Sequence, residues 1–383
     1  MQNFSFYNPV KIIFGQGTIS KLSKELPQSS KIMLIYGSGS IKKNGVYQQV
    51  YDVLKDFVTV EFSGIEPNPH FETCMKCVEK IKAENVDFLL AVGGGSVIDA
   101  TKFIAAAAKF NGDAWKIMTG EGRVNEALPF GTVLTLPATA SEMNKGAVIT
   151  KAETREKLAF HSEKVYPKFS ILDPETTYTL PKIQIANGII DTFVHVTEQY
   201  LTTNENAKIQ DYFAESILKV LIEESKIVFE NPTDYDCRAN LMWAATWGLN
   251  GWIGQGNIED WATHIIGHEL TAFHEIDHGQ TLAIVLPGVM KIMQGEKREK
   301  ILQMGKNVFG IKEIDEDKII NLTINAVDEF FQSLGIKTHL NDYNVGNETI
   351  TKIVERFKER EWLLGEHENI DSEIVEIILK DRI

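Results

Sequence analysis

The residues of this sequence whose types and spacing are suited to chemistry are a carboxylate and a cluster of histidines. Five of its nine histidines fall between positions 195 and 278. Asp191 and His195 are four residues apart, as are His264 and His268, a spacing that puts two side chains on one face of a helix. A carboxylate with several imidazoles suits divalent iron, zinc, cobalt or manganese. The pattern predicts a metal site built from a subset of Asp191, His195, His264, His268, His274 and His278.

A second chemical signal is a set of small-residue loops, each after a short apolar run. Gly37-Ser38-Gly39-Ser40 follows Lys31–Tyr36, Gly93-Gly94-Gly95-Ser96 follows Asp87–Val92, and Pro137-Ala138-Thr139-Ala140-Ser141 follows Gly131–Leu136. Glycines let a backbone approach a phosphate, and the next helix offers its N–H groups and dipole. One such loop is also what a plain strand-to-helix turn looks like, and none has the G-x-G-x-x-G spacing. Three together favour a bound dinucleotide.

The first loop indicates which dinucleotide. No Asp or Glu occurs between Lys31 and Tyr51, although an acidic residue near a strand end usually holds an unphosphorylated adenosine ribose. Ser38, Ser40, Lys42 and Lys43 occur there instead, and hydroxyls with ammonium groups suit a 2′-phosphate. We therefore expect NADP(H) in preference to NAD(H), the alternative being a surface loop with two solvated lysines.

The elements that must position these residues fall into two regions. Apolar runs alternate with amphipathic stretches such as Val46–Phe57 and Val97–Phe110, which predicts a mostly parallel sheet with crossover helices. From Pro181 onward the periodicity is helical. We expect a nucleotide-binding α/β domain over 1–180 and a helical metal-binding domain over 181–383. The expected helices of the second region include Ile190–Tyr200, Asn206–Phe229, Asn240–Leu249 and Asp260–Leu270.

Composition narrows the class of partner and the compartment. A formal charge of −14 argues against nucleic acid or an anionic membrane as a partner, since both attract basic proteins. No run reaches the length of a membrane span and the start lacks the order of a secretory signal, so we expect a cytoplasmic protein. The three cysteines do not suggest a disulfide framework. Cys74-x-x-Cys77 has no second pair, and we interpret both cysteines as buried or half-buried helix residues.

Together these motifs resemble the iron-containing (group III) alcohol dehydrogenase family, and within it the NADPH-dependent butanol dehydrogenase or aldehyde reductase branch. The resemblance implies a Rossmann-like dinucleotide-binding domain and an all-α C-terminal domain, an architecture shared with dehydroquinate synthase. The matching motifs, in order over most of the chain, are Asn8–Gly15, Gly93–Lys102, Leu136–Glu142, Asn187–His195, Trp261–Leu270 and His274–Gly279.

The resemblance also implies roles for individual residues. One divalent ion, Fe²⁺ or Zn²⁺, would be held by Asp191, His195, His264 and His278. The phosphate loop falls on Gly94, Gly95 and Ser96 with Asp99 and Lys102; the nicotinamide side falls on Thr135, Thr139, Ser141 and Lys157; and the 2′-phosphate side falls on Gly37, Ser38, Gly39, Ser40 and Lys43. We expect a homodimer that acts on a small alcohol or aldehyde.

The expected reaction is metal-assisted hydride transfer between the nicotinamide and a carbonyl carbon. Catalytic candidates are Asp99 and, as a proton relay, His268, or His274 if its loop comes closer. Alternatives are a nicotinamide-using lyase or cyclase of dehydroquinate synthase type, and a metal-dependent hydrolase. Four tryptophans lie near the ligand helices, namely Trp243, Trp247, Trp252 and Trp261. We interpret them as core residues of the helices in preference to the lining of a substrate site.

Overall fold

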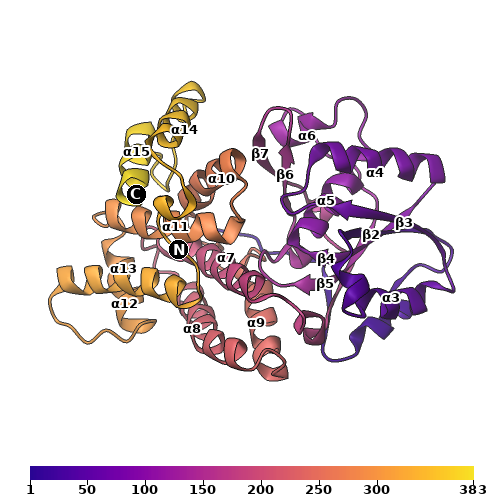
Figure 1. Ribbon diagram of the computed structural model, residues 1–383, viewed down its shortest axis with the longest axis horizontal. Coiled ribbons are helices and arrows are strands. Elements are labelled where there is room, and N and C mark those ends of the chain that lie inside the picture. The colour runs from indigo at the N-terminus through magenta and orange to yellow at the C-terminus, as the bar shows by residue number, and fades with distance from the viewer. The chain divides into compact units, whose positions relative to one another are not determined.

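The computed structural model describes residues 1–383 and divides the chain into two compact units. An α/β unit comprises residues 7–180 and 231–246, and a helical unit comprises residues 1–6, 181–230 and 247–383. The division at Leu180/Pro181 lies where the sequence changes from alternating to helical periodicity. The expected fold class, a parallel α/β domain followed by an all-helical one, is confirmed (Figure 1).

The α/β unit is built on a six-stranded parallel sheet in the order β1-β8-β5-β4-β2-β3. Strand β4 returns to the side of β2 opposite β3, so the strand order reverses between β2 and β4. In open sheets, ligands bind outside the carboxyl ends of the strands at such a reversal. The strands are β1 Lys11–Phe14, β2 Lys31–Gly37, β3 Val58–Ile65, β4 Phe88–Gly94, β5 Phe130–Leu136 and β8 Phe169–Leu172.

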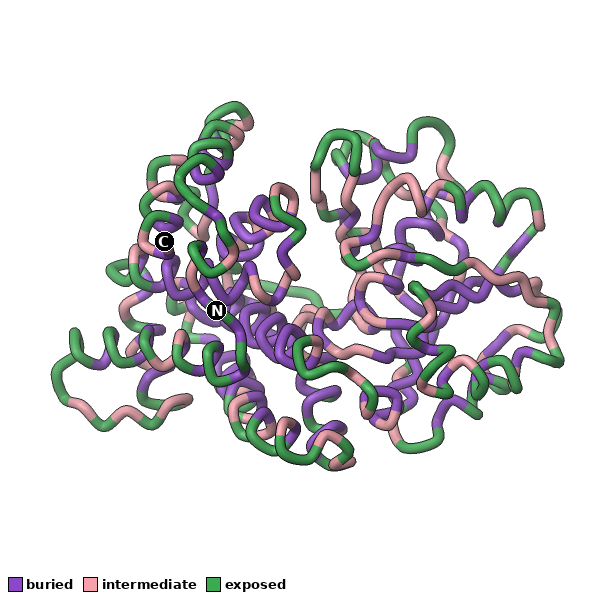
Figure 2. The backbone as a smooth tube through the Cα atoms, viewed as in Figure 1, coloured by how far each residue is buried: buried purple, intermediate pink, exposed green.

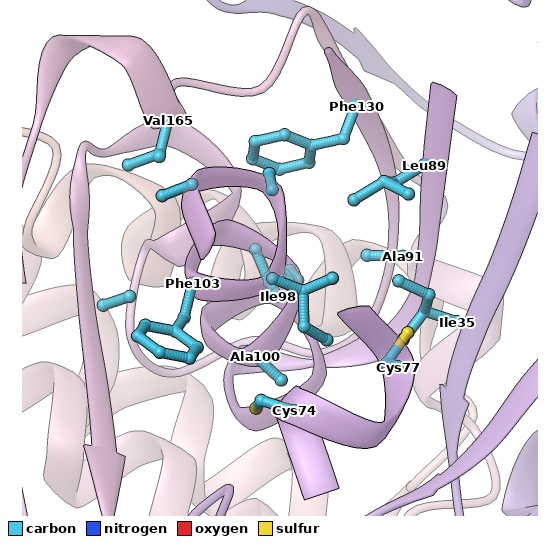
Figure 3. Packing of buried hydrophobic residues seen from close by; sticks show 14 of the residues in the cluster. Ile35, Cys74, Cys77, Leu89, Ala91, Ile98, Ala100, Phe103, Phe130 and Val165 are labelled. Atoms are coloured by element: carbon cyan, nitrogen blue, oxygen red, sulfur yellow. The ribbon is translucent and has the colours of Figure 1, made fainter. Parts of the chain in front are cut away.

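Crossover helices cover the sheet, and one of them forms the centre of the core. Helix α5 buries nearly every residue, and Figure 3 shows Ile98, Ala100 and Phe103 of this helix packed among apolar side chains. Cys74 and Cys77 are free thiols in this core, as the sequence predicts, and burial raises the pKa of both. The helices of this unit are α1 Leu22–Glu25, α2 Ser40–Lys43, α3 Val46–Leu54, α4 Phe71–Glu84, α5 Gly95–Ala107 and α6 Trp115–Thr119.

An antiparallel hairpin that the sequence analysis did not anticipate follows β5. Strands β6 (Gly146–Lys151) and β7 (Glu156–His161) pair in register outside the main sheet. The loop from Leu136 to Gly146 leads into it and carries the predicted Thr139 and Ser141. The hairpin therefore extends the loop on which the nicotinamide-side residues lie.

The helical unit is organised around α7 (Lys182–Tyr200), whose residues from Ile185 onward are all buried, as the purple tube in Figure 2 shows. Because α7 packs against α8, α10 and α11, its polar residues can only be tolerated with partners. The other helices of this unit are α8 Lys208–Glu230, α10 Ala262–His274, α11 His278–Ile292, α12 Arg298–Asn307, α13 Glu316–Ser333, α14 Asn347–Glu359 and α15 Ser372–Asp381. Helix α9, Tyr235–Gly248, belongs to the α/β unit up to Thr246.

Two segments depart from the expected partition at about residue 180. Residues 231–246 group with the α/β unit because Met242 joins its core and Thr246 donates a hydrogen bond to Glu142 Oε1 at 2.6 Å. Residues 1–6 group with the helical unit, where Gln2 N donates to Gly256 O and Phe6 packs on Trp252. None of the helices has both the length and the apolar character that crossing a bilayer requires.

Candidate metal and cofactor sites

Helix α7 presents a line of polar side chains along one face. Asn187, Asp191 and His195 follow one another at four-residue spacing, and Glu198 lies one turn further on. All four are buried. The helix begins just after Pro181 and not at Ile190 as expected, so Asn187 is in the same helix as the predicted ligands.

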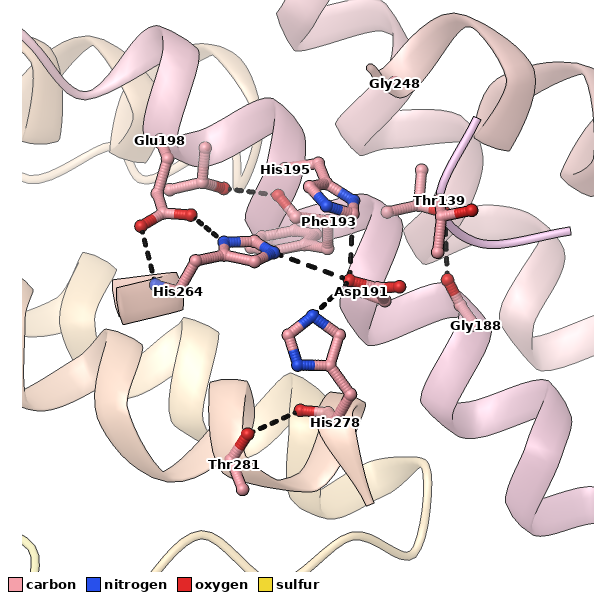
Figure 4. Close-up of polar contacts among 12 residues, drawn as sticks. Thr139, Gly188, Asp191, Phe193, His195, Glu198, Gly248, His264, His278 and Thr281 are labelled. Atoms are coloured by element: carbon pink, nitrogen blue, oxygen red, sulfur yellow. Dashed lines mark hydrogen bonds and ion pairs between the residues drawn. The ribbon is translucent and has the colours of Figure 1, made fainter. Parts of the chain in front are cut away.

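Three imidazoles converge on one carboxylate oxygen of this helix (Figure 4). Asp191 Oδ1 is 3.4 Å from His195 Nδ1, 3.7 Å from His264 Nε2 and 3.6 Å from His278 Nε2. Asp191, His195 and His264 offer ligand atoms that all lie within 4.8 Å of one another. The rings of His195 and His264 stack with centroids 4.4 Å apart. The four predicted ligands are thus brought together, with His278 the most exposed of them.

His264 is oriented by a residue that the sequence analysis missed. Glu198 Oε1 accepts a hydrogen bond from the His264 backbone N–H at 3.0 Å, and Glu198 Oε2 accepts one from ring Nδ1. Nε2 of His264 is buried without a hydrogen-bond partner. Burial disfavours the imidazolium, but Glu198 and Asp191 outweigh it and raise the pKa of His264 to about 9.

This arrangement fits a metal ion better than a proton. An imidazole that donates from Nδ1 to a carboxylate presents its other nitrogen as a ligand, the usual arrangement around protein-bound zinc. A buried polar atom without a partner is rare and calls for an explanation. One carboxylate and three imidazoles at these distances supply a set that divalent iron or zinc accepts.

His278 reaches the same point because α11 begins against α7. Asn187 Nδ2 donates to Asp277 Oδ2 at 3.0 Å, one residue before His278. Gly279 lies so close to α7 that a Cβ there would be 2.6 Å from Asn187 O. The chain turns into α11 after Glu275, which has a left-handed φ of 56°. These contacts fix the position of the fourth predicted ligand.

The two histidines predicted as proton relays lie in different places. The His268 ring is 5.3 Å from that of His278 and 6.2 Å from that of His264, so it lies beside the convergent group. Helix α10 runs on to His274, beyond the expected end at Leu270. His274 is exposed and its Nε2 makes a 2.8 Å hydrogen bond with Thr349 Oγ1 on α14. Of the two, only His268 is beside the predicted ligands.

The tryptophans also separate by position. Trp247 packs on Phe213, Trp252 on Phe6, and Trp243 on Phe14, all edge to face. Trp261 differs, because its ring stands 5.6 Å from that of His264 and 6.3 Å from that of His195. One of the four tryptophans therefore lies against the ligand set.

In the α/β unit, the glycine loop after β4 is packed against the loop after β5. A Cβ on Gly95 would lie 2.4 Å from Thr139 Oγ1, so only glycine allows this approach. Gly94 and Ser96 are partly exposed at the start of α5, where the helix offers its first N–H groups. The loop expected at the phosphates and the loop expected on the nicotinamide side are thus adjacent.

The other residues expected near the cofactor occupy the same unit. Thr135 is buried near the end of β5, and Lys157 on β7 donates from Nζ to Asn68 Oδ1 at 3.0 Å. Ser141 Oγ donates to Asp99 Oδ1 at 2.5 Å. Lys102 is fully buried. The side chain of Lys102 therefore points into the protein, whereas Asp99 is partly exposed.

A carboxylate outside residues 31–51 lies beside β2 and the helix that follows its loop. Glu61 on the adjacent strand β3 accepts hydrogen bonds from Tyr36 Oη at 2.9 Å and from Tyr47 Oη at 2.7 Å. The second bond is the main reason that the pKa of Tyr47 rises to about 12. The ammonium of Lys42 lies over both tyrosine rings, 5.2 and 4.7 Å from their centroids. Ser38, Ser40 and Lys43 are exposed.

Comparisons with known proteins agree with this geometry. Residues 9–174 match the family model described as iron-containing alcohol dehydrogenase, and residues 185–383 match the model for the C-terminal part of the Fe-containing alcohol dehydrogenase family. The chain belongs to the iron-containing alcohol dehydrogenase family. It is 50% identical to the NADPH-dependent aldehyde reductase YqhD of Escherichia coli strain K12, with 98% of each chain covered. It is 43% identical to a probable NADH-dependent butanol dehydrogenase of Bacillus subtilis strain 168, with 99% of each covered.

Solved structures of this family show the same architecture. The crystal structure of E. coli YqhD superposes with a TM-score of 0.98 at 48% identity, covering 100% of this chain and 99% of that one. An NADH-dependent butanol dehydrogenase A from Thermotoga maritima superposes with a TM-score of 0.95 at 39% identity and the same coverage. The chain is an oxidoreductase of the alcohol dehydrogenase class, in the aldehyde reductase and butanol dehydrogenase branch. The lyase and hydrolase alternatives are not favoured.

Proposed function

We propose that this iron-containing alcohol dehydrogenase homologue reduces small aldehydes with NADPH, and oxidises the matching alcohols with NADP⁺, at an Fe²⁺ or Zn²⁺ ion held by Asp191, His195, His264 and His278. The observation that carries the metal assignment is the convergence of three imidazole nitrogens within 3.7 Å of Asp191 Oδ1. The Nε2 atom of His264 also supports the metal assignment, because it is buried and has no hydrogen-bond partner.

The chemistry follows from these parts. A Lewis-acid metal would polarise the carbonyl, and a nicotinamide would supply the hydride. Glu198 keeps the Nδ1 proton of His264 engaged, so its other nitrogen faces Asp191. His268 is our candidate for exchanging a proton with the substrate oxygen, because its ring lies beside His278 and His264.

For the cofactor we propose three loops. Gly37, Ser38, Gly39, Ser40 and Lys43 would receive the adenosine 2′-phosphate, Gly94, Gly95 and Ser96 the diphosphate, and Thr135, Thr139, Ser141 and Lys157 the nicotinamide half. Two observations support NADP(H). Lys43 and both serines of the first loop are exposed, and both oxygens of the nearby Glu61 are occupied by tyrosine hydroxyls. The relative at 50% identity is named NADPH-dependent, whereas those at 43% are named NADH-dependent.

The test is anaerobic purification, removal of metal, and reconstitution with Fe²⁺ or Zn²⁺ in separate samples. NADPH oxidation is then followed by absorbance with a short aliphatic aldehyde such as butyraldehyde. We expect stoichiometric NADPH loss only in a metal-loaded sample, and a lower kcat/KM with NADH. Equal activity of the metal-free protein would refute the metal assignment, and a higher kcat/KM with NADH would refute the cofactor assignment.

We also propose a cytoplasmic homodimer; the compartment is the one expected from the sequence, and the dimer is the one expected from the family resemblance. The chain mass is 43.1 kDa, so light scattering after size-exclusion chromatography should give twice that value. A mass equal to one chain would contradict this proposal.

A further inference from the structure

The family resemblance alone assigns Lys102 and Asp99 to the cofactor phosphates. In this structure both side chains form hydrogen bonds with another segment of the protein. Lys102 is 0% exposed, and its Nζ donates to Asn144 Oδ1 and to Gly146 O, each at 2.7 Å. Asp99 lies one turn earlier on α5 and accepts hydrogen bonds from Ser141 Oγ at 2.5 Å and from the Val148 backbone N–H at 2.9 Å. All four partners lie in the segment 141–148, which follows the β5 loop.

The bonds of Lys102 lie between those of Asp99 along the segment. Asp99 holds positions 141 and 148, and Lys102 holds positions 144 and 146 between them. Asn144 is itself a branch point, because its Nδ2 donates to Thr139 O at 3.1 Å and its Oδ1 accepts from Gly146 N. Two side chains of one helix therefore fix the path of the loop from Thr139 into strand β6.

The backbone conformation of this loop has to be stabilised by its neighbours. Ala140 has a φ of 50°, in the left-handed region that a residue with a Cβ adopts only at a cost. Its neighbour Thr139 presses on Gly95 of the glycine loop, where no Cβ could be accommodated. The surrounding contacts must offset the cost of this backbone conformation, and the hydrogen bonds of Asp99 and Lys102 join the loop to α5.

A phosphate role conflicts with this arrangement. Two of the three Nζ hydrogens of Lys102 are taken by protein acceptors, and the group has no exposed surface, so a bound anion would have to displace surrounding protein to reach it. Burial also lowers the pKa of Lys102 to about 8, partly opposed by Asp99 and Glu142, so this ammonium loses its proton more readily than that of a surface lysine. Gly94 and Ser96, by contrast, are partly exposed.

We propose that Asp99 and Lys102 are positioning residues that hold the Thr139–Val148 loop against the glycine loop, and that neither binds the phosphates. The proposal rests on the proposed dinucleotide site. It follows that different turns of α5 have different roles. The first turn would bind the diphosphate, and the next two turns would position the loop that carries Thr139 and Ser141. Loss of either residue should therefore affect the nicotinamide half of the cofactor and spare the phosphate half.

The experiment separates the two halves with a fragment. The probe is 2′-phospho-ADP-ribose, which contains every phosphate of NADPH and lacks the nicotinamide. Its affinity is measured by calorimetry for the metal-loaded wild type and Lys102→Met, beside steady-state kinetics with NADPH and butyraldehyde. We expect unchanged fragment affinity and a kcat lower by about 10²-fold, the loss that a misplacement of about 1 Å causes. A fragment affinity weaker by about tenfold or more, the loss of a charged hydrogen bond, would overturn the proposal.

Asn144→Ala provides a second test if Lys102→Met folds poorly. It removes the loop-side acceptor and leaves the lysine in place, so the proposal predicts the same split between kcat and fragment affinity. Faster amide hydrogen exchange at residues 139–148 in the apo variants, with no change in α3, would show the loop loosening without any cofactor. An unchanged kcat and unchanged exchange in Asn144→Ala would refute the positioning role. If wild type neither binds the fragment nor oxidises NADPH, the proposed function itself has failed.

Discussion

Glu198 is bonded twice to His264: its Oε1 accepts from the backbone N–H and its Oε2 from ring Nδ1. One carboxylate on α7 thereby sets both the start of α10 and the orientation of the imidazole that α10 contributes. Asn187 does the corresponding work for α11 through Asp277. Helix α7 thus carries two predicted ligands and the side chains that locate the other two.

The Glu198 relationship leads to a prediction about metal affinity. Glu198→Gln keeps the size of the side chain but removes its charge and one acceptor, so we expect divalent metal to bind about 10–100-fold more weakly. Competition with a chelator measures this directly. Glu215→Gln is the matched control, since Glu215 is also buried in the helical unit but accepts from Tyr200, Gln303 and Asn307. If both variants bind metal as wild type does, Glu198 has no such role.

The predicted ligands and the predicted relay should differ when removed. Asp191→Ala and His278→Ala should lose bound metal and nearly all turnover, because three remaining groups form an incomplete shell. His268→Ala should keep about one metal per chain while kcat falls by roughly 10²–10⁴. Exposed His274 is the control, and His274→Ala should keep both metal and activity. Metal analysis by mass spectrometry distinguishes the cases, and full metal content in the Asp191 variant would refute the site.

Residue spacing predicted only part of this site. Asp191 and His195 share a helix, so their separation of four residues is enough to place them together. His278 depends on a left-handed residue at Glu275 and on the approach of Gly279 to α7, which are tertiary features without a periodic signal. Glu198 did leave a signal, since it stands three residues after His195 on the same helix, but a lone glutamate in a helix is ordinary.

The structure of the α/β unit was also predicted only in part from the sequence. The strands Lys31–Tyr36, Asp87–Val92 and Gly131–Leu136 were expected to within two residues of β2, β4 and β5, because buried parallel strands are continuous apolar runs. The order of the strands and the hairpin β6–β7 follow from tertiary packing and were not expected. Glu61 could not be predicted to lie near the loop after β2, because it is on β3, ten residues beyond Tyr51 in the sequence. Adjacent strands bring it beside Tyr36.

Because α11 approaches α7 closely at Gly279, a single added methyl group there should lower the stability of the protein. Gly279→Ala places a Cβ 2.6 Å from Asn187 O, a backbone atom that cannot rotate away. We expect a loss of about 1–3 kcal/mol of stability and a lower metal content, because α11 must move and carries His278 with it. Thermal melting and metal analysis test the two effects. Gly295→Ala is the control, since nothing lies within 4 Å of its Cβ position; equal behaviour of both variants would contradict the argument.

Cofactor preference should respond to Ser38 and Lys43 more than to Lys42. Ser38 is exposed, so Ser38→Asp adds a carboxylate that would repel a 2′-phosphate and shift the kcat/KM ratio toward NADH. Lys43→Met should lower kcat/KM for NADPH by about tenfold and leave that for NADH unchanged. Lys42→Met is the matched control, because that ammonium already lies over Tyr36 and Tyr47. A larger effect on kcat/KM at Lys42 than at Lys43 would show that the contacts with the two tyrosine rings do not hold the Lys42 ammonium in place.

The burial of Lys102 predicts how stability depends on pH. Burial lowers its pKa from 10.5 to about 8, so between these values the unfolded chain binds a proton at this amine that the folded chain does not. Folded stability from this residue must therefore rise with pH across that window, by at most about 1.4 kcal/mol per pH unit.

Lys102→Met removes the titrating group and with it this slope. We expect the melting temperature of wild type relative to Lys102→Met to increase steadily from pH 8 to pH 10, whatever the difference at pH 7. Differential scanning fluorimetry of the metal-loaded proteins in buffers of constant ionic strength measures it. A difference that stays flat would mean that Asp99 and Glu142 fully offset the effect of burial on the Lys102 ammonium, and it would contradict the lowered pKa.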